Sequence, residues 1–142
     1  MMSPEPTVLL VEDDENDVFL MEWALQKAKL SLPMKVAMDG QEALDYLGGV
    51  GKYADRTAYP MPAIIFLDLK LPYVHGFEVL RWIRQQPALR EISVLILTSS
   101  PEERDQQKAM DLGAHAYLVK PPTAEMLLKA MPSLIPAPAP AS

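Results

Sequence analysis

The stretch Ala63-Ile-Ile-Phe-Leu-Asp-Leu-Lys-Leu-Pro72 contains one acidic residue, Asp68, within a run that is otherwise almost entirely apolar. The residues from Ile64 to Leu67 are aliphatic or aromatic, which is typical of a strand covered on both faces, as in a parallel sheet. An ionised carboxylate buried without a partner would destabilise such a strand strongly. We therefore expect Asp68 to lie where the strand leaves the sheet, within reach of groups that stabilise its charge.

The composition places the chain among single-domain globular proteins. It has 142 residues, of which 49% are hydrophobic, and a formal net charge of -6. A chain of this length buries a core without cross-links. Because it contains no cysteine, disulfides, thiol nucleophiles and cysteine-ligated metal sites are excluded. The negative charge argues against nucleic acid or an anionic membrane surface as a partner.

The sequence contains no segment typical of a targeting signal or a membrane span. The amino terminus lacks a basic patch followed by an apolar run. No apolar stretch approaches the roughly 20 residues that are needed to cross a bilayer. We therefore expect a soluble, cytoplasmic protein.

Strand-like and helix-like segments alternate five times along the chain. The predicted strands cover residues 7–11, 34–38, 63–69, 93–97 and 114–119. The predicted helices cover 16–30, 41–47, 76–86 and 101–113, with a last helix capped by Thr123. Five such units predict an α/β fold, a doubly wound parallel sheet with right-handed crossovers. The strand order 2-1-3-4-5 places strands one and three side by side at the switch point.

Three further segments carry local predictions. Residues 50–62 show no sustained period and predict a surface loop, longer than the usual connection of about 2 to 6 residues. Pro101 is expected to open the fourth helix in its first turn, where proline is favoured. Residues 132–142 are rich in proline and alanine and are expected to be extended or disordered.

Polar residues follow the carboxyl ends of four predicted strands. Glu12 and Asp13 follow the first strand, and Asp68, Thr98 and Lys120 end the third, fourth and fifth. Ligands of doubly wound sheets bind outside these strand ends, so the five side chains should gather at one edge. Three neighbouring carboxylates repel one another and require a divalent cation or an ammonium group. Because oxygen ligands favour a hard ion, the pattern predicts a Mg²⁺ site suited to a phosphoryl group.

Four short segments carry a resemblance to a known family. They are Val11-Glu-Asp-Asp14, Leu67-Asp-Leu-Lys-Leu-Pro72, Leu97-Thr-Ser99 and Gly113-Ala-His-Ala-Tyr-Leu-Val-Lys-Pro-Pro122. In this order on alternating strands and helices, they resemble the response-regulator receiver domain of two-component signalling, as in the single-domain chemotaxis regulators. The resemblance covers residues 5–135 and implies a flavodoxin-like (βα)5 fold, which leaves 136–142 as a disordered tail.

The resemblance implies roles for the acidic residues. Asp68 would be the phosphoacceptor, whose carboxylate attacks a phosphohistidine to give an aspartyl phosphate. Asp13, Asp68 and the backbone carbonyl of Lys70 would bind Mg²⁺ directly. Glu12 stands where many relatives have Asp, and it would act mainly through a metal-bound water.

The resemblance also implies how the phosphoryl group is held and sensed. Lys120 would bring a positive charge to the phosphoryl oxygens, and the Lys120–Pro121 bond would be cis. Thr98 would turn its hydroxyl towards the new phosphoryl group, and Tyr117 matches the aromatic position coupled to that movement. The protein would not be an enzyme beyond catalysing its own phosphorylation and dephosphorylation. It would signal by conformational change or by phosphorelay.

The kind of partner is also implied. The phosphoryl group would come from a histidine kinase and would be read by a downstream protein. The insertion at residues 50–62 and the lack of an output domain resemble the small regulators that serve bacterial phytochrome histidine kinases. A homodimer through the fourth helix, fifth strand and fifth helix is a further implication of the family.

Three other functions fit parts of the pattern. A phosphatase of the haloacid dehalogenase type also forms an aspartyl phosphate, but it needs a second Asp where this chain has Lys70. A flavin carrier of the flavodoxin type needs a Ser/Thr/Gly-rich phosphate loop where this chain has Glu12 and Asp13. A non-phosphorylated pseudo-receiver acting as a scaffold stays open, although such proteins commonly lack one of the acids, the Thr or the Lys.

Overall fold

The structure is a computed structural model that describes residues 6–131. Its strands form one parallel sheet in the order β2-β1-β3-β4-β5. The strands are β1 (Val8–Val11), β2 (Met34–Ala37), β3 (Ile64–Leu67), β4 (Ser93–Thr98) and β5 (Ala116–Val119). The register places Val11 opposite Leu67, so β1 and β3 are neighbours. The predicted flavodoxin-like α/β fold and its strand order are confirmed.

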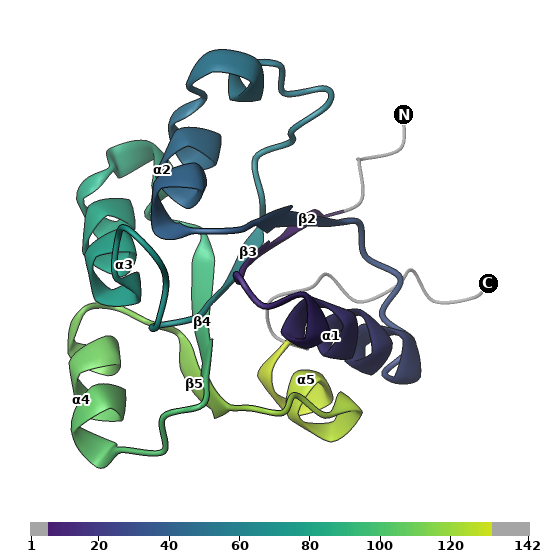
Figure 1. Ribbon diagram of the computed structural model, residues 1–142. Helices are drawn as coiled ribbons and strands as arrows, with labels where there is room; N and C mark the ends of the chain where they lie inside the picture. Colours follow the sequence, from purple (N-terminus) through teal and green to yellow (C-terminus); the bar gives the residue numbers. More distant parts are fainter. Residues whose placement is uncertain (1–5, 132–142) are drawn as a thin grey trace.

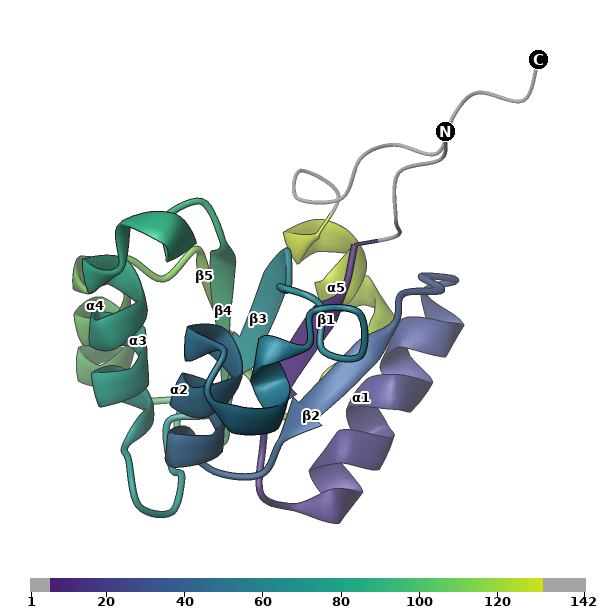
Figure 2. The same ribbon diagram turned by 90° about the horizontal axis from the view of Figure 1, so that it is seen from above.

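Helices cover both faces of this sheet (Figure 1). On one face lie α1 (Glu15–Lys27) and α5 (Ala124–Ala130). The view from above shows α2 (Gly40–Gly48), α3 (Gly76–Gln85) and α4 (Glu103–Asp111) on the other face (Figure 2). Two short 3-10 helices, η1 (Gly51–Ala54) and η2 (Pro87–Leu89), follow α2 and α3. The doubly wound arrangement therefore leaves both faces of the sheet covered.

Two predictions concern parts of the chain beyond the fold just described. The boundary of the domain at residues 5–135 and the disordered tail at 132–142 depend on residues outside the described range.

Within residues 6–131, no helix combines the length and the apolar character needed to cross a bilayer. The peptide bond between Lys120 and Pro121 is cis, as expected.

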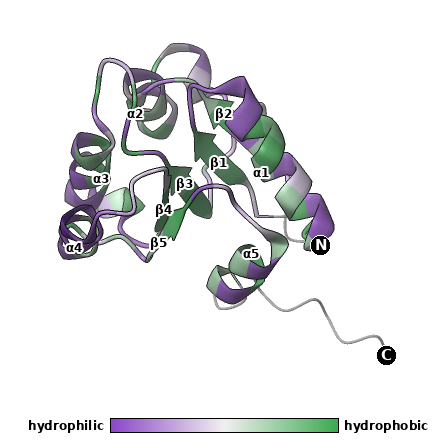
Figure 3. Cartoon of the chain, turned by 60° about the horizontal axis from the view of Figure 1, so that its bottom comes forward, coloured by the Kyte–Doolittle hydropathy of each residue, from purple (hydrophilic) through white to green (hydrophobic). Residues whose placement is uncertain are grey.

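The strands build two separate hydrophobic cores because successive residues point to opposite faces. Leu9 and Ile65 belong to the core beneath α2, α3 and α4. Leu10 and Phe66 belong to the core beneath α1 and α5. All residues of β1 and β3 are buried, and these strands form the green centre of Figure 3. Burial on both sides explains why these segments read as continuous apolar runs.

The start of α4 differs from the prediction. The helix begins at Glu103, with Glu102 as its N-cap, so the prediction that Pro101 opens it is wrong. The Ser100 hydroxyl accepts a hydrogen bond from the Glu102 amide at 3.3 Å and donates one to Asp105 at 2.7 Å. These contacts hold Pro101 in the non-helical segment that precedes the helix.

Residues 50–62 pack onto α2, so the prediction of a surface loop holds only in part. Tyr53 of η1 is 8% exposed, and its hydroxyl donates to Glu42 at 3.1 Å. The Arg56 guanidinium donates to the carbonyls of Tyr46 at 2.8 Å and Leu47 at 3.1 Å. Carbonyls at the end of a helix lack partners within the helix. The Arg56 guanidinium donates hydrogen bonds to two of them. The segment is therefore ordered by contacts with α2 that leave no periodic pattern in the sequence.

We expect Arg56→Met to lower the free energy of unfolding by about 1–3 kcal/mol, because two carbonyls at the end of α2 lose their charged donor. Chemical denaturation measures this change. Arg81→Met is the matched control, because Arg81 is exposed on α3 and its replacement should change stability by less than about 0.5 kcal/mol. Equal losses in the two variants would contradict the assigned role of Arg56.

Candidate functional site

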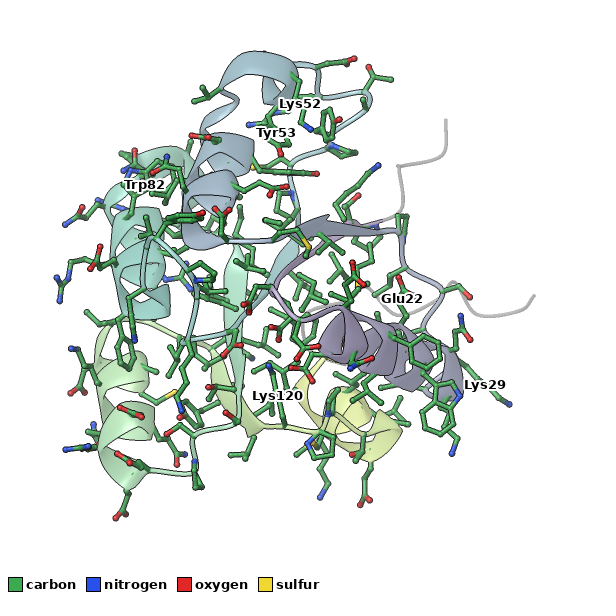
Figure 4. All side chains as sticks on the ribbon, in the orientation of Figure 1. Glu22, Lys29, Lys52, Tyr53, Trp82 and Lys120 are labelled. Carbon is green, nitrogen blue, oxygen red and sulfur yellow. The ribbon has the colours of Figure 1, made fainter. Side chains whose placement is uncertain are left out.

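The carboxyl ends of β1, β3 and β5 meet at one edge of the sheet and bring predicted site residues together. Glu12 follows β1, Asp68 follows β3 and Lys120 follows β5. The Lys120 ammonium donates a hydrogen bond to Asp68 Oδ2 at 3.0 Å and another to a Glu12 carboxylate oxygen. In Figure 4, Lys120 reaches into the group of carboxylates beside the start of α1. Three separate βα units thus supply one charged cluster.

The pleat of the sheet explains why these three side chains share one face. Leu10 of β1 and Phe66 of β3 face the core beneath α1 and α5. Glu12 and Asp68 each lie two residues further along the chain, so the period of two directs them to the same side. Lys120 continues the row of β5 that packs against the same core. The site therefore lies on the side of the sheet covered by α1.

Asp13 completes a group of three carboxylates. Oxygen atoms of Glu12, Asp13 and Asp68 all lie within 4.8 Å of one another. Glu12 is 1% and Asp68 6% exposed, whereas Asp13 is exposed to solvent. The amide of Lys70 donates to Asp68 Oδ1 at 3.2 Å and helps to orient that carboxylate. A donor set made only of oxygen atoms fits a hard divalent cation such as Mg²⁺ or Mn²⁺.

The electrostatics of the cluster also indicate a need for positive charge. The pKa of Glu12 is raised to about 7, mainly by burial and also by repulsion from Asp68. The hydrogen bond from Lys120 lowers this pKa but does not offset the effect of burial. Burial acts to lower the pKa of Lys120, but its hydrogen bonds to Asp17, Glu12 and Asp68 outweigh this effect and raise it. The lysine is therefore charged at neutral pH. The carboxylates nevertheless outnumber it, so a bound cation would stabilise their ionised forms.

Thr98 and Tyr117 both contact the loop between β4 and α4. Thr98 is completely buried, and its hydroxyl oxygen accepts a long hydrogen bond of 3.5 Å from the Ser100 amide. Tyr117 packs against the core beneath α2, α3 and α4. Its hydroxyl donates to the Ser100 carbonyl at 2.8 Å. Ser100 therefore connects Thr98, which by the family resemblance would turn towards the phosphoryl group, with Tyr117, which by the same resemblance would be the switch residue.

One contact of the cluster was missed by the sequence analysis. Asp17, in the first turn of α1, accepts a hydrogen bond from the Lys120 ammonium at 2.8 Å. Acidic residues are common in the first turn of a helix because they complement its dipole, so an aspartate at this position does not by itself indicate a site residue. Its position in the first turn of α1 places it near the strand ends, but nothing in the sequence identifies Lys120 as its partner. Side chains of helical residues point towards the amino terminus, which here lies at the strand ends.

The sequence is similar throughout the described fold to a known family. The model of the response regulator receiver domain matches residues 8–132. This chain belongs to that family. Response regulator Rcp1 of Synechocystis sp. strain PCC 6803 is 36% identical to this receiver over 118 residues, which span 83% of this chain and 78% of Rcp1.

Solved structures of response regulators, two of them named for phytochromes, share the fold of this receiver. Bacteriophytochrome response regulator RtBRR has a TM-score of 0.81 at 45% identity, covering 92% of this chain and 78% of its own. The phosphorylated cyanobacterial phytochrome response regulator RcpA has a TM-score of 0.76 at 33% identity, covering 89% and 88%. The Mn²⁺-bound form of Rcp1 has a TM-score of 0.77 at 32% identity, covering 94% and 100%. The predicted family is confirmed, and so is the narrower resemblance to phytochrome response regulators.

Proposed function

We propose that this receiver accepts a phosphoryl group on Asp68 from a histidine kinase in a Mg²⁺-dependent reaction. The observation that carries the proposal is the position of Asp68, whose carboxylate lies 3.0 Å from the Lys120 ammonium and within the group of three acids. A nucleophile, a positive charge and oxygen ligands for a hard cation thus meet at one point. The phosphorylated RcpA and the Mn²⁺-bound Rcp1 are relatives that support the same chemistry.

Each residue of the cluster has a separate task in the transfer. A carboxylate oxygen of Asp68 attacks the phosphorus of a phosphohistidine, and the P–N bond breaks as the O–P bond forms. The Lys120 ammonium stabilises the negative charge on the phosphoryl oxygens. Glu12, Asp13, Asp68 and the Lys70 carbonyl would hold Mg²⁺, with Glu12 acting through water. When bound, the ion neutralises charge on the phosphoryl oxygens.

The phosphorylated state would be sensed through Thr98 and Tyr117. Because the hydrogen bond of Thr98 to the Ser100 amide is long, at 3.5 Å, its hydroxyl can exchange that contact for a phosphoryl oxygen at small cost. The loop after β4 would then shift, and the contact of Tyr117 with Ser100 links this shift to the surface of β5. Phosphorylation would bias an existing equilibrium between two conformations.

The kinase that we infer is of the phytochrome type. RtBRR and RcpA, both phytochrome response regulators by name, support this inference with 45% and 33% identity. A downstream protein would read the surface formed by α4, β5 and α5, and a homodimer through the same surface stays a prediction. The pseudo-receiver alternative is not favoured, because all three acids, Thr98 and Lys120 are present.

The proposal is tested by labelling with acetyl phosphate and Mg²⁺. Intact-mass spectrometry should find one added phosphate on the wild type and none on Asp68→Asn, because the amide is not a nucleophile. Asp111→Asn, at the exposed end of α4, is the matched control and should be labelled like the wild type. Equal labelling of the wild type and Asp68→Asn would show that the acceptor is another residue. A wild type that takes up no phosphate from acetyl phosphate or from a histidine kinase would support the scaffold alternative.

A further inference from the structure

We infer that Asp17 is a positioning residue that holds the Lys120 ammonium against the acceptor carboxylate of Asp68. The inference rests on the proposed function and deepens it, because it assigns a fourth acid to the same site. Asp17 lies on α1, whereas the other residues of the cluster follow strands. Through this contact the helix layer reaches the site.

The three N–H groups of Lys120 each have a different carboxylate partner. The ammonium lies 2.8 Å from Asp17 Oδ2 and 3.0 Å from Asp68 Oδ2, and its third partner is Glu12. The Lys120 side chain is only 12% exposed. A lysine side chain has four flexible bonds, so full pairing of its donors is what confines the charge to one position. Loss of one partner frees the ammonium to move away from Asp68.

Asp17 differs from Glu12 and Asp68, the other two partners of Lys120, because it has no second role in the proposed reaction. Glu12 and Asp68 belong to the group of three acids that fits a divalent cation, and Asp17 is outside that group as the structure describes it. Once Asp68 carries a phosphoryl group, its oxygen atoms also change their partners. Asp17 neither belongs to the group that fits the cation nor carries the phosphoryl group. Its contact with Lys120 can therefore persist before, during and after phosphoryl transfer.

The first turn of α1 is built to hold Asp17 in place. The Asp14 carboxylate caps the helix by accepting from the amides of Asn16 at 2.8 Å and Asp17 at 3.4 Å. Met21, one turn after Asp17 on the same side of the helix, is fully buried in the core beneath α1 and α5. The Asp17 side chain is 27% exposed. Its ion pair with Lys120 is therefore more confined and less screened than a pair on the surface.

The rival explanation is that Asp17 only complements the dipole of α1. Glu15 separates the two explanations, because it lies in the same turn, carries the same charge and is exposed. Glu15→Gln and Asp17→Asn each remove one negative charge from that turn. A dipole role predicts equal effects of the two substitutions, whereas a positioning role predicts an effect at the site from Asp17→Asn alone.

The first measurement is the rate of phosphorylation by acetyl phosphate at saturating Mg²⁺. We expect Asp17→Asn to react about tenfold more slowly than the wild type, an effect at the lower end of those found for residues that orient metal ligands. Glu15→Gln should react within about twofold of the wild-type rate. A rate for Asp17→Asn that equals or exceeds that of the wild type would overturn the inference, because Asp17 would then be idle or would compete for the lysine.

The second measurement uses neither a phosphodonor nor a metal. In ¹⁵N NMR spectra of the metal-free protein, the Lys120 ammonium should give a signal, assigned by its loss in Lys120→Met, because hydrogen bonding slows its exchange with water. The signal should remain in Glu15→Gln and disappear in Asp17→Asn. Its persistence in Asp17→Asn, or its absence from the wild type, overturns the inference. If the wild type accepts no phosphate, the proposed function fails, and the NMR result still decides whether Asp17 holds the lysine.

Discussion

Lys120→Met should be phosphorylated by acetyl phosphate at least about 10²-fold more slowly than the wild type, because the phosphoryl oxygens lose the positive charge that stabilises them during transfer. Methionine has a similar length and no charge, so Asp68 keeps its position in the fold. The rate is measured by mass spectrometry at saturating Mg²⁺. Binding of Mg²⁺, measured by calorimetry, should stay equal or become tighter, because a cation next to the carboxylates has been removed.

The combination of slower transfer with undiminished Mg²⁺ binding distinguishes loss of charge stabilisation from loss of the metal site. Lys129→Met is the control, because the Lys129 side chain on α5 is 80% exposed and lies outside the cluster. It should react at the rate of the wild type. If Lys120→Met were phosphorylated as fast as the wild type, Lys120 would have no part in the transfer.

Phe66→Ala should cause the largest loss of stability among these substitutions, about 3–5 kcal/mol. Phe66 is completely buried in β3, in the core beneath α1 and α5. Its removal leaves a cavity at the centre of the sheet, where neighbouring strands restrict collapse. Domains of ordinary stability have about 5–15 kcal/mol in total, so this variant would retain little margin. Chemical denaturation should show a lower midpoint with an unchanged slope.

Phe19→Ala is the matched control for this substitution. Phe19 lies on α1 and is 64% exposed, so its truncation should change the free energy of unfolding by no more than about 0.5 kcal/mol. Comparable losses for the two variants would contradict the assignment of Phe66 to the core. Because the Phe66→Ala variant would retain little stability, a smaller fraction of its molecules should be folded and able to accept a phosphoryl group at elevated temperature.

The fold was predictable because its signals are local. The run from Ile64 to Leu67 is apolar throughout since both faces of β3 are covered, and repetition of such runs between helical periods specifies the parallel sheet. The meeting of Glu12, Asp68 and Lys120 was also predictable, because parallel strands end at the same edge.

The errors arose where hydrogen bonds of a single side chain, and not a periodic pattern, decided the structure. Proline is typical of the first turn of a helix, which is why Pro101 predicts a helix start. The hydrogen bonds of Ser100 instead keep Pro101 outside α4, which begins at Glu103. Residues 50–62 show no period, but Arg56 attaches them to the end of α2. Neither set of contacts follows from periodicity or composition, because each depends on which groups the local path of the backbone brings within reach of one side chain.

By itself, the sequence determined the order of strands and helices along the chain, the sheet edge at which the strands end and the charged residues that meet there. These features follow from apolar runs and periodicity, which are properties of short segments. Only the tertiary structure decided that Asp17 is a partner of Lys120. The two residues are 103 positions apart, and their contact exists because α1 packs over the row of side chains that Glu12, Asp68 and Lys120 extend. The placement of a helix over a sheet depends on the whole core between them, which no local pattern records.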